Sequence, residues 1–392
     1  MVRQFLLFIF LIFIVFACQQ NKLTCVPTEV VMLIDSLKAQ YVPDGRVAIF
    51  KVEAAFDNGR LVLKGETDQP EALEILVDQL SEHELESQIN LLPDESTYAY
   101  KHAIVNNSVA NLRSNPKHSA ELATQAILGT VMKVLKITGE WYLVQTPDDY
   151  IAWVDHGGVS LKSEEDFAVW ENVEKVIITS NHAIVADDQE NIVSDVILGN
   201  ILEKISETKE AWLVRFPDGR TGKVSKDSAL DYQVWLTALE PTGDLIESYA
   251  RSLMGTPYLW GGTSSKGMDC SGFTKTVYWM NGLIIPRDAS QQVNAGVVVD
   301  ADLKFENLEK GDLLFFGKPA TDSTKQRTTH VGIWLDNSEF IHASKQVRIS
   351  SIDENSPNYD EFNKNRYLGS RRYLKNGEGN IVDLKTELTF QK

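Results

Sequence analysis

Hydrophobic and polar positions change their spacing along the chain, and the changes predict separate folding units. Residues 30–39 carry apolar side chains at helical spacing. Two β-type runs then flank Asn58-Gly59, a dipeptide that favours a hairpin because both of its turn positions need positive φ. A second helix is expected from Pro70 onward, with apolar residues on one face. Residues 19–98 are therefore predicted to form a small α+β module.

The middle of the chain contains an internal repeat. ILGTV at residues 127–131 recurs as ILGNI at residues 197–201, an offset of 70. HAIV at residues 102–105 recurs at residues 182–185, an offset of 80, which predicts ten extra residues in the first copy between positions 106 and 126. Short β-type runs broken by Gly, Pro and Asp are typical of small barrels. Two barrels are predicted, over residues 99–165 and 166–236, with Trp141, Trp153 and Trp212 as core or rim aromatics.

The third region holds most of the candidate chemistry. Gly, Ser and Thr crowd the stretch before Cys270, and Phe273, Val277 and Tyr278 follow at helical spacing. Cys270 is therefore expected where a loop enters a helix, close to unpaired N–H groups and the positive end of the helix dipole. Both favour the thiolate, which is the nucleophilic form. A preceding helix is expected over residues 244–254.

Two histidines lie in a predicted hairpin that could supply a base for this thiol. Residues 331–335 and 340–343 read as strands around a turn. A loop of odd length centred on Asn337 would place His330 and His342 on one face, whereas a two-residue turn would place them on opposite faces. The sequence leaves both registers open, and a catalytic role needs the odd one.

The N-terminus reads as an export signal. Arg3 precedes an apolar run over residues 5–16, which is too short for a hydrocarbon core of about 30 Å. The run ends at VFAC, which resembles a bacterial lipobox; the signal segment is assigned to residues 1–18, and the resemblance implies cleavage before its last residue, Cys18, which becomes the lipidated N-terminus. An ordinary signal peptide is the alternative. The expected location is periplasmic, with the chain anchored to a membrane through lipid on Cys18.

Composition excludes several other classes of protein. The chain has 392 residues and a net charge of -17, which argues against a nucleic-acid partner. Its three cysteines can form neither a disulfide scaffold nor a four-Cys zinc site. Cys270 with two histidines could supply three zinc ligands, but no fourth ligand or HxxxH spacing appears. We therefore expect no metal and no organic cofactor, and a monomer.

Six ordered motifs carry a specific resemblance. YLWGG, DCSGF, PRDASQQ, KGDLLFF, HVGIWL and FIHAS, all within residues 245–374, resemble the NlpC/p60 family of papain-like cell-wall cysteine peptidases. The resemblance implies an α+β multidomain chain with a peptidase domain at residues 240–375 and a tail at 376–392. It also implies that Cys270 is the nucleophile, His330 the general base and His342 the residue that orients His330.

Two SH3-like domains before such a peptidase resemble the γ-D-glutamyl-diamino acid endopeptidases that recycle murein peptides with a free N-terminal L-Ala. That resemblance implies that Glu121 and Tyr150 of the first barrel hold the substrate amine. The other implied substrate-binding residues are Tyr258, Trp260, Asp269, Ser271 and Asp288. The predicted substrates are murein-derived peptides, cut at the γ-D-glutamyl-diaminopimelate bond.

Other readings of these residues are open at this point. The same fold could act as an amidase or as a hydrolase of intact peptidoglycan, or the chain could be a non-catalytic wall-binding scaffold. Tyr258 and Trp260 could be packing residues, and Asp288 beside Arg287 could be a surface ion pair of little worth.

Overall fold

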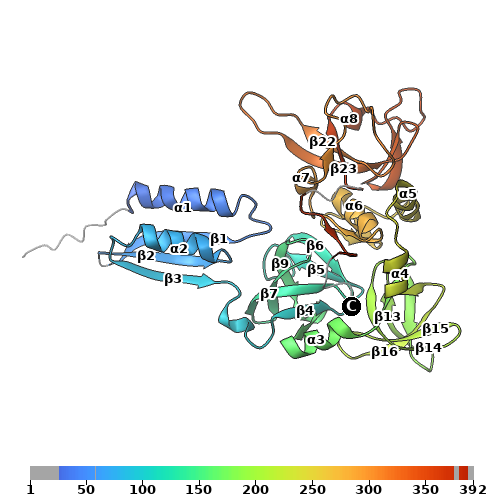
Figure 1. The fold of residues 1–392 in the computed structure, drawn as a ribbon, viewed down its shortest axis with the longest axis horizontal. Coiled ribbons are helices and arrows are strands. Elements are labelled where there is room, and N and C mark those ends of the chain that lie inside the picture. Colours follow the sequence, from blue (N-terminus) through green and yellow to red (C-terminus); the bar gives the residue numbers. More distant parts are fainter. Residues whose placement is uncertain (1–25, 58, 375–378, 387–392) are drawn as a thin grey trace, which may run out of the picture. The chain divides into compact units, whose positions relative to one another are not determined.

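The computed structural model describes residues 26–57, 59–374 and 379–386 (Figure 1). The predicted leader, with Cys18, lies outside these residues. The chain divides into two compact units, one made of residues up to 43 together with 50–90, the other of residues 44–49 together with 91 onward. Within the described part of the chain, no helix is both long enough and apolar enough to cross a membrane.

The first unit is the predicted α+β module. Both expected helices form, and Asp57 pairs with Arg60 across the expected hairpin. A third strand completes an antiparallel sheet of order β1-β2-β3. Its core is apolar and includes Val30, Leu61 and Leu76, which are fully buried. The elements are α1 (Thr28–Tyr41), β1 (Phe50–Asp57), β2 (Arg60–Thr67), α2 (Pro70–Gln79) and β3 (Leu85–Leu91).

The second unit begins with two barrels that confirm the internal repeat. Their strand orders are β10-β4-β7-β8-β9-β5-β6 and β13-β12-β16-β15-β14-β11-β17, which are the same topology read in opposite directions. The first comprises β4 (His102–Val105), β5 (Val109–Arg113), β6 (Leu122–Ile127), β7 (Val131–Thr138), β8 (Trp141–Gln145), β9 (Ile151–Asp155) and β10 (Val159–Lys162). After α3 (Glu164–Asn172), the second comprises β11 (Lys175–Ile178), β12 (Ala183–Ala186), β13 (Ile192–Val196), β14 (Ile201–Glu207), β15 (Ala211–Arg215), β16 (Thr221–Ser225) and β17 (Ala229–Asp231).

The predicted ten-residue insertion is wrong. Gly129 N–H donates to the carbonyl of Val105, and Gly199 N–H donates to the carbonyl of Ile178, so Val105 corresponds to Ile178. The intervals are 129 − 105 = 24 and 199 − 178 = 21 residues, so the first copy has three extra residues. The HAIV match instead aligns β4 with β12, whereas the topology equates β4 with β11. The β5–β6 loop is the longer one, with residues 114–121 against 187–191 between β12 and β13.

The repeated turn, residues 127–131 in the first copy and 197–201 in the second, packs each barrel against the domain that follows it. Leu128 of the first copy is fully buried in the core of the second barrel, and Leu198 of the second copy lies in the core of the third domain. A Cβ on Gly129 would lie 2.4 Å from the carbonyl oxygen of Ile201, and one on Gly199 would lie 2.6 Å from the Trp279 ring. Glycine is favoured at both positions because φ is positive and a neighbour leaves no room for a Cβ, the Ile201 backbone at Gly129 and the Trp279 ring at Gly199.

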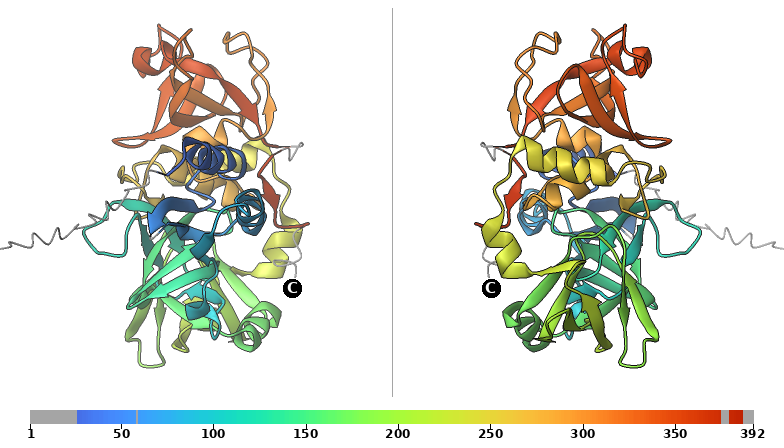
Figure 2. Two further views of the ribbon diagram at one scale, coloured as in Figure 1. Left: turned by 90° about the vertical axis from the view of Figure 1, so that its left-hand side faces the viewer. Right: turned by 90° about the vertical axis from the view of Figure 1, so that its right-hand side faces the viewer.

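The third domain packs helices against one antiparallel sheet of order β21-β26-β22-β23-β24-β25. Both views of Figure 2 show α6 between this sheet and the two barrels. Its helices are α4 (Tyr232–Ala238), α5 (Gly243–Ser252), α6 (Cys270–Trp279), α7 (Ala289–Gln292) and α8 (Glu361–Lys364). Its strands are β18 (Thr263–Ser264), β19 (Gly267–Met268), β20 (Leu283–Ile284), β21 (Val297–Val298), β22 (Leu313–Lys318), β23 (Arg327–Trp334), β24 (Glu339–Ser344), β25 (Gln346–Ser351), β26 (Tyr367–Arg372) and β27 (Val382–Asp383).

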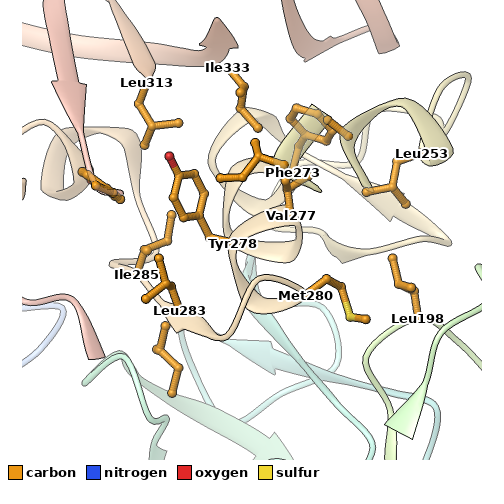
Figure 3. Close-up of a cluster of buried hydrophobic side chains, with 14 of the residues drawn as sticks. Leu198, Leu253, Phe273, Val277, Tyr278, Met280, Leu283, Ile285, Leu313 and Ile333 are labelled. Atoms are coloured by element: carbon orange, nitrogen blue, oxygen red, sulfur yellow. The ribbon is translucent and has the colours of Figure 1, made fainter. Parts of the chain in front are cut away.

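The core of this domain holds α6 in place. Phe273, Val277 and Tyr278 are fully buried and pack with Leu313 and Ile333 of the sheet, which Figure 3 draws as sticks. The apolar residues that the sequence places at helical spacing after Cys270 therefore form the buried face of α6. Among the repeat's tryptophans, Trp212 is a core residue, as predicted. Trp153 is partly buried against a smaller cluster.

Candidate active site

Cys270 is the first residue of α6, as the sequence predicts. Asp269 caps the helix, because its Oδ1 accepts a 2.8 Å hydrogen bond from the Gly272 N–H. Gly272 lets the helix start against the preceding loop, since a Cβ there would lie 2.0 Å from the carbonyl oxygen of Gly262. The thiol is 8% exposed and is the only cysteine among the described residues. The position of the thiol is therefore set by the Asp269 cap and by the close packing of Gly272 against Gly262.

The expected low pKa of this thiol is wrong for the structure described. Burial and, to a smaller extent, the negative charge of Asp269 raise the pKa of Cys270, with a net result of about 12. The N–H groups of Val331 and Ser271 and the charge of Arg287 oppose this shift without cancelling it. The helix terminus acts in the predicted direction, but desolvation of the charged form is the larger effect. The net shift of the pKa therefore favours the neutral thiol over the thiolate.

The histidines lie on one face of the sheet, because the hairpin has the odd register. Ile333 pairs with Ile341 and Trp334 with Phe340, so the loop is centred on Asn337. His330 Nε2 and His342 Nδ1 are 2.7 Å apart, and both side chains are buried. The geometry that a catalytic pair needs is therefore present.

Hydrogen bonds orient this pair. His342 Nε2 is 3.0 Å from the Ser350 Oγ and 3.9 Å from an Asp360 carboxylate oxygen. Because His330 Nε2 is engaged by His342, His330 has only Nδ1 left for another partner. The next residue, Val331, donates its N–H to the Cys270 thiol, which brings the end of α6 to the histidine strand.

Both imidazoles are held neutral. Burial lowers the pKa of His330 well below its ordinary value, and the neighbouring His342 lowers it further. Burial also lowers the pKa of His342, to about 3, with Arg348 and Arg366 acting in the same direction. The pKa shifts of Cys270, His330 and His342 therefore all favour the neutral forms over a resting thiolate–imidazolium ion pair.

A buried charge network supports the start of α6. Arg287 is 1% exposed, and its NH2 lies 2.7 Å from Asp269 Oδ2. It also donates to Ser271 Oγ at 2.9 Å and to Thr124 Oγ1 of the first barrel at 2.8 Å. Arg287 and Asp288 do form an ion pair, at 3.7 Å, but the reading of it as a surface pair is wrong because Arg287 is buried and lies closer to Asp269, at 2.7 Å. Sequence reasoning missed this role, since the partner lies 18 positions away.

Two aromatic residues connect the thiol to the first barrel. Burial raises the pKa of Tyr258 to about 12, and the charges of Cys270 and Asp269 act in the same direction, which places Tyr258 beside the thiol. Trp260 is 64% exposed, and its Nε1 donates a 2.8 Å hydrogen bond to Glu121 Oε1. Neither ring is an ordinary core residue. Glu121 lies in the lengthened β5–β6 loop.

A second charged group forms around Asp288. Burial raises the pKa of Tyr150, and the charge of Asp288 acts in the same direction, so the two side chains are neighbours. Asp288 Oδ2 accepts a 2.6 Å hydrogen bond from Arg46 NH1, from a segment to which the sequence assigned no role. Among the described residues, no group of three or more His, Cys, Asp or Glu side chains is placed to hold a metal ion.

A thiol at a helix N-terminus, bonded to the N–H of the residue that follows one member of a hydrogen-bonded imidazole pair, is an arrangement that suits a cysteine hydrolase. Family models agree with this class. Residues 255–374 match the NlpC/P60 family, and residues 112–158 match the bacterial dipeptidyl-peptidase SH3 domain.

Individual relatives extend the match beyond these segments. The chain is 32% identical over 265 residues to a gamma-D-glutamyl-L-lysine dipeptidyl-peptidase of Bacillus cereus, covering 65% of this chain and 76% of that protein. It is 27% identical over 270 residues to dipeptidyl-peptidase 6 of Lysinibacillus sphaericus, covering 66% and 94%. A crystal structure of an NlpC/P60 family protein from Bacillus cereus aligns with a TM-score of 0.58 and 28% identity, covering 70% of this chain and 99% of that one. The chain belongs to the NlpC/P60 family of peptidases and carries the bacterial SH3 domain.

Proposed function

We propose that this protein hydrolyses the γ-D-glutamyl-diamino acid bond of murein-derived peptides that begin with a free L-Ala amine. One observation carries the proposal: the Trp260–Glu121 hydrogen bond, which ties an acid of the first barrel to the loop that leads into Cys270. Glu121, which the first barrel supplies, is an acid that can pair with the N-terminal ammonium group of a short peptide substrate. The relatives named for γ-D-glutamyl peptides support the same bond.

The proposed chemistry uses Cys270, His330 and His342. His330 Nδ1 takes the thiol proton as Sγ attacks the carbonyl carbon of the γ-D-glutamyl amide, and the N–H of Cys270 stabilises the oxyanion. The imidazolium then gives its proton to the departing amine of the diamino acid. Water, deprotonated by His330, hydrolyses the thioester and regenerates the thiol. His342 keeps His330 in the productive orientation through the 2.7 Å contact between their rings.

The substrate amine is proposed to bind between Glu121, Tyr150 and Asp288. Two carboxylates and a phenol provide hydrogen-bond acceptors for an ammonium group. N-acylation removes the charge and leaves partly desolvated carboxylates without a partner, which disfavours glycan-linked stem peptides. Tyr258 and Trp260 are proposed to line the cleft between this end and the thiol.

Asp269 and Ser271 are proposed to act through the protein and not by direct side-chain contact with substrate. Asp269 is 6% exposed, and its oxygens accept from Gly261 and Gly272 N–H groups and from Arg287. Ser271 Oγ accepts from Arg287 and donates to Asp269. These bonds hold the first turn of α6, and with it the thiol and the N–H proposed for the oxyanion.

We further propose export to the periplasm, with cleavage before Cys18 so that residues 1–17 are removed and Cys18 becomes the lipid-anchored N-terminus. The proposed domain boundaries follow the sequence: a module at 19–98, barrels at 99–165 and 166–236, a peptidase domain at 240–375 and a tail at 376–392. Murein peptides are released outside the cytoplasmic membrane, so this location matches the proposed substrate. Labelling with radioactive palmitate, lost in Cys18→Ala, tests the anchor.

Product analysis by mass spectrometry tests the reaction. The full chain, purified in mild detergent, would receive L-Ala-γ-D-Glu-diaminopimelate, its N-acetylated twin and intact sacculi, with Cys270→Ala as the inactive control. Much faster release of diaminopimelate from the free-amine peptide than from its N-acetylated twin, without digestion of sacculi, supports the proposal. Cleavage of sacculi instead would indicate a hydrolase of intact wall. If no substrate is cut while wall fragments bind, the chain is a binding scaffold.

A second comparison tests the amine site. Glu121→Gln should raise KM for the free-amine peptide far more than for the N-acetylated one, because only the former carries the cation. Glu210→Gln, an exposed acid in a turn of the second barrel, is the matched control and should change neither KM. Equal effects of Glu121→Gln on both peptides would remove Glu121 from the amine site.

A further inference from the structure

Residues 44–49, far from the peptidase domain in sequence, belong structurally to the same compact unit as that domain. They lie outside both segments matched by the family models. The carbonyl of Arg46 accepts a 2.7 Å hydrogen bond from the Ile151 N–H, next to Tyr150, and the carbonyl of Val47 accepts one from Gln145. Ile49 packs in a small core with Leu143. The segment is thus attached to the first barrel along its length.

The side chain of Arg46 is as firmly held as its backbone. Its Nε and NH2 donate to the two oxygens of Asp44 at 2.8 and 2.7 Å, a bidentate pair. Its NH1 donates to Asp288 Oδ2 at 2.6 Å and to Ser290 Oγ at 3.0 Å. Gln291 donates to Asp44 at 2.8 Å, which ties the acid to α7 as well. The guanidinium therefore has a fixed place between Asp44 and Asp288.

This arrangement leaves Asp288 able to bind a ligand. Oδ2 accepts from Arg46, and the Asp288 side chain forms a capping box with Gln291, whereas Oδ1 lies 3.7 Å from Arg287, beyond hydrogen-bond distance. Because each carboxylate oxygen can accept about two hydrogen bonds, Asp288 keeps acceptor capacity for a ligand. The Asp288 side chain is 27% exposed, so it is accessible to solvent. A carboxylate held by a charged hydrogen bond on one oxygen presents the other in a fixed direction.

We propose that Arg46 is a positioning residue for the amine end of the substrate, acting through Asp288. The inference rests on the proposed function, because it assigns Asp288 to the peptide's ammonium group. Arg46 fixes the Asp288 rotamer, and Asp44 with Gln291 fixes Arg46. A segment near the N-terminus of the chain thereby helps to select substrates with a free N-terminal amine.

An alternative role for the same guanidinium makes the opposite prediction. If Arg46 occupied the ammonium site itself, it would have to leave Asp288 before the peptide could bind. Two features indicate that Arg46 stays in place: its backbone carbonyl accepts a hydrogen bond from Ile151, and its side chain donates two hydrogen bonds to Asp44. Replacing Arg46 would lower KM if it blocked the ammonium site, whereas it raises KM if Arg46 positions Asp288.

Steady-state kinetics of Arg46→Ala in the full chain test the inference. We expect KM for L-Ala-γ-D-Glu-diaminopimelate to rise about three- to tenfold, the effect of one partly exposed charged hydrogen bond, with kcat little changed. Activity on the N-acetylated peptide should not change. Arg46→Lys keeps the charge without the bidentate geometry and should restore part of the loss. Asp44→Asn should raise KM in the same way.

The matched control is Arg215→Ala. Arg215 forms a 2.7 Å surface ion pair with Glu203 in the second barrel, with a similar exposed fraction, and its loss should leave KM unchanged. An unchanged or lowered KM in Arg46→Ala, or an equal fall in kcat for both peptides, would overturn the inference. If the wild-type chain cleaves the free-amine peptide and Arg46→Ala behaves like Arg215→Ala, only this inference fails. If the wild-type chain cleaves neither peptide, the proposed function fails as well.

Discussion

Replacing Arg287 by Met should destabilise the protein severely. The two side chains have similar length, but Met removes four hydrogen bonds, two to Asp269 and one each to Ser271 and Thr124. Asp269 would remain 6% exposed without its cationic partner, and Thr124, fully buried, would lose its donor. The free energy of unfolding is therefore the quantity that should change.

The size of the loss follows from burial. Breaking a buried ion pair by removing one partner costs about 3–5 kcal/mol, because the remaining charge is left uncompensated in a poorly polarisable environment. An exposed pair such as Arg215–Glu203 is worth about 0–1 kcal/mol. Since domains have a total stability of about 5–15 kcal/mol, the change at Arg287 would remove a large fraction of it.

Urea unfolding, followed by tryptophan fluorescence, measures this change. Arg287→Met and Arg215→Ala would be compared with the wild-type chain, and Arg287→Met would also be combined with Asp269→Asn, which removes the charge but keeps an oxygen to cap α6. The double variant should recover stability relative to Arg287→Met alone, because it no longer buries an unpaired carboxylate. A loss below about 1 kcal/mol for Arg287→Met, or no recovery in the double variant, would refute the reasoning.

Three further predictions concern the thiol, the histidines and the helix start. Because burial raises the pKa of Cys270 to about 12, its alkylation by iodoacetamide should stay slow at pH 7 and accelerate with each pH unit above 8; a plateau below pH 8 would contradict this. His330 and His342 have lowered pKa values in the folded chain, so below pH 6.5 the unfolded chain binds more protons than the folded one. The free energy of unfolding should therefore decrease as the pH is lowered below 6.5, by up to about 1.4 kcal/mol per pH unit for each histidine. Urea titrations at several pH values should show a smaller slope for His342→Gln than for the wild type. Gly272→Ala should cost about 1–3 kcal/mol in the same assay and reduce kcat, since its Cβ would lie 2.0 Å from the Gly262 carbonyl oxygen; wild-type kcat would argue against a fixed helix start.

The sequence predicted the elements well where the signal was local. Helical spacing after Cys270 placed α6, and the Asn-Gly turn placed the first hairpin. The HAIV match failed because Ala, Ile and Val recur in many strands, so a four-residue string of them does not identify equivalent positions. The topology of the whole sheet was needed to align the two copies.

Features that depend on distant contacts were beyond sequence reasoning. Arg287 was read with its neighbour Asp288, but its main partner is Asp269, and Arg46 contacts a residue 242 positions away. The thiol's pKa was misjudged for a related reason. The sequence showed a helix terminus, whose effect is local, but not the burial of Cys270, which depends on the packing of the complete domain.

The repeated Leu of the two barrels has a consequence for how the chain could be divided. Leu128 and Leu198 occupy the same place in their own barrels, yet each is buried in the following body. The same turn of each barrel thus contributes a leucine to the core of the domain that follows it. The first barrel fills part of the core of the second, and the second fills part of the core of the peptidase domain. A peptidase domain expressed alone would lose Leu198 from the buried cluster that also contains Met280, which would leave an apolar socket (Figure 3 labels both residues). Shortened versions of this protein should therefore aggregate unless they keep the second barrel or fill that socket.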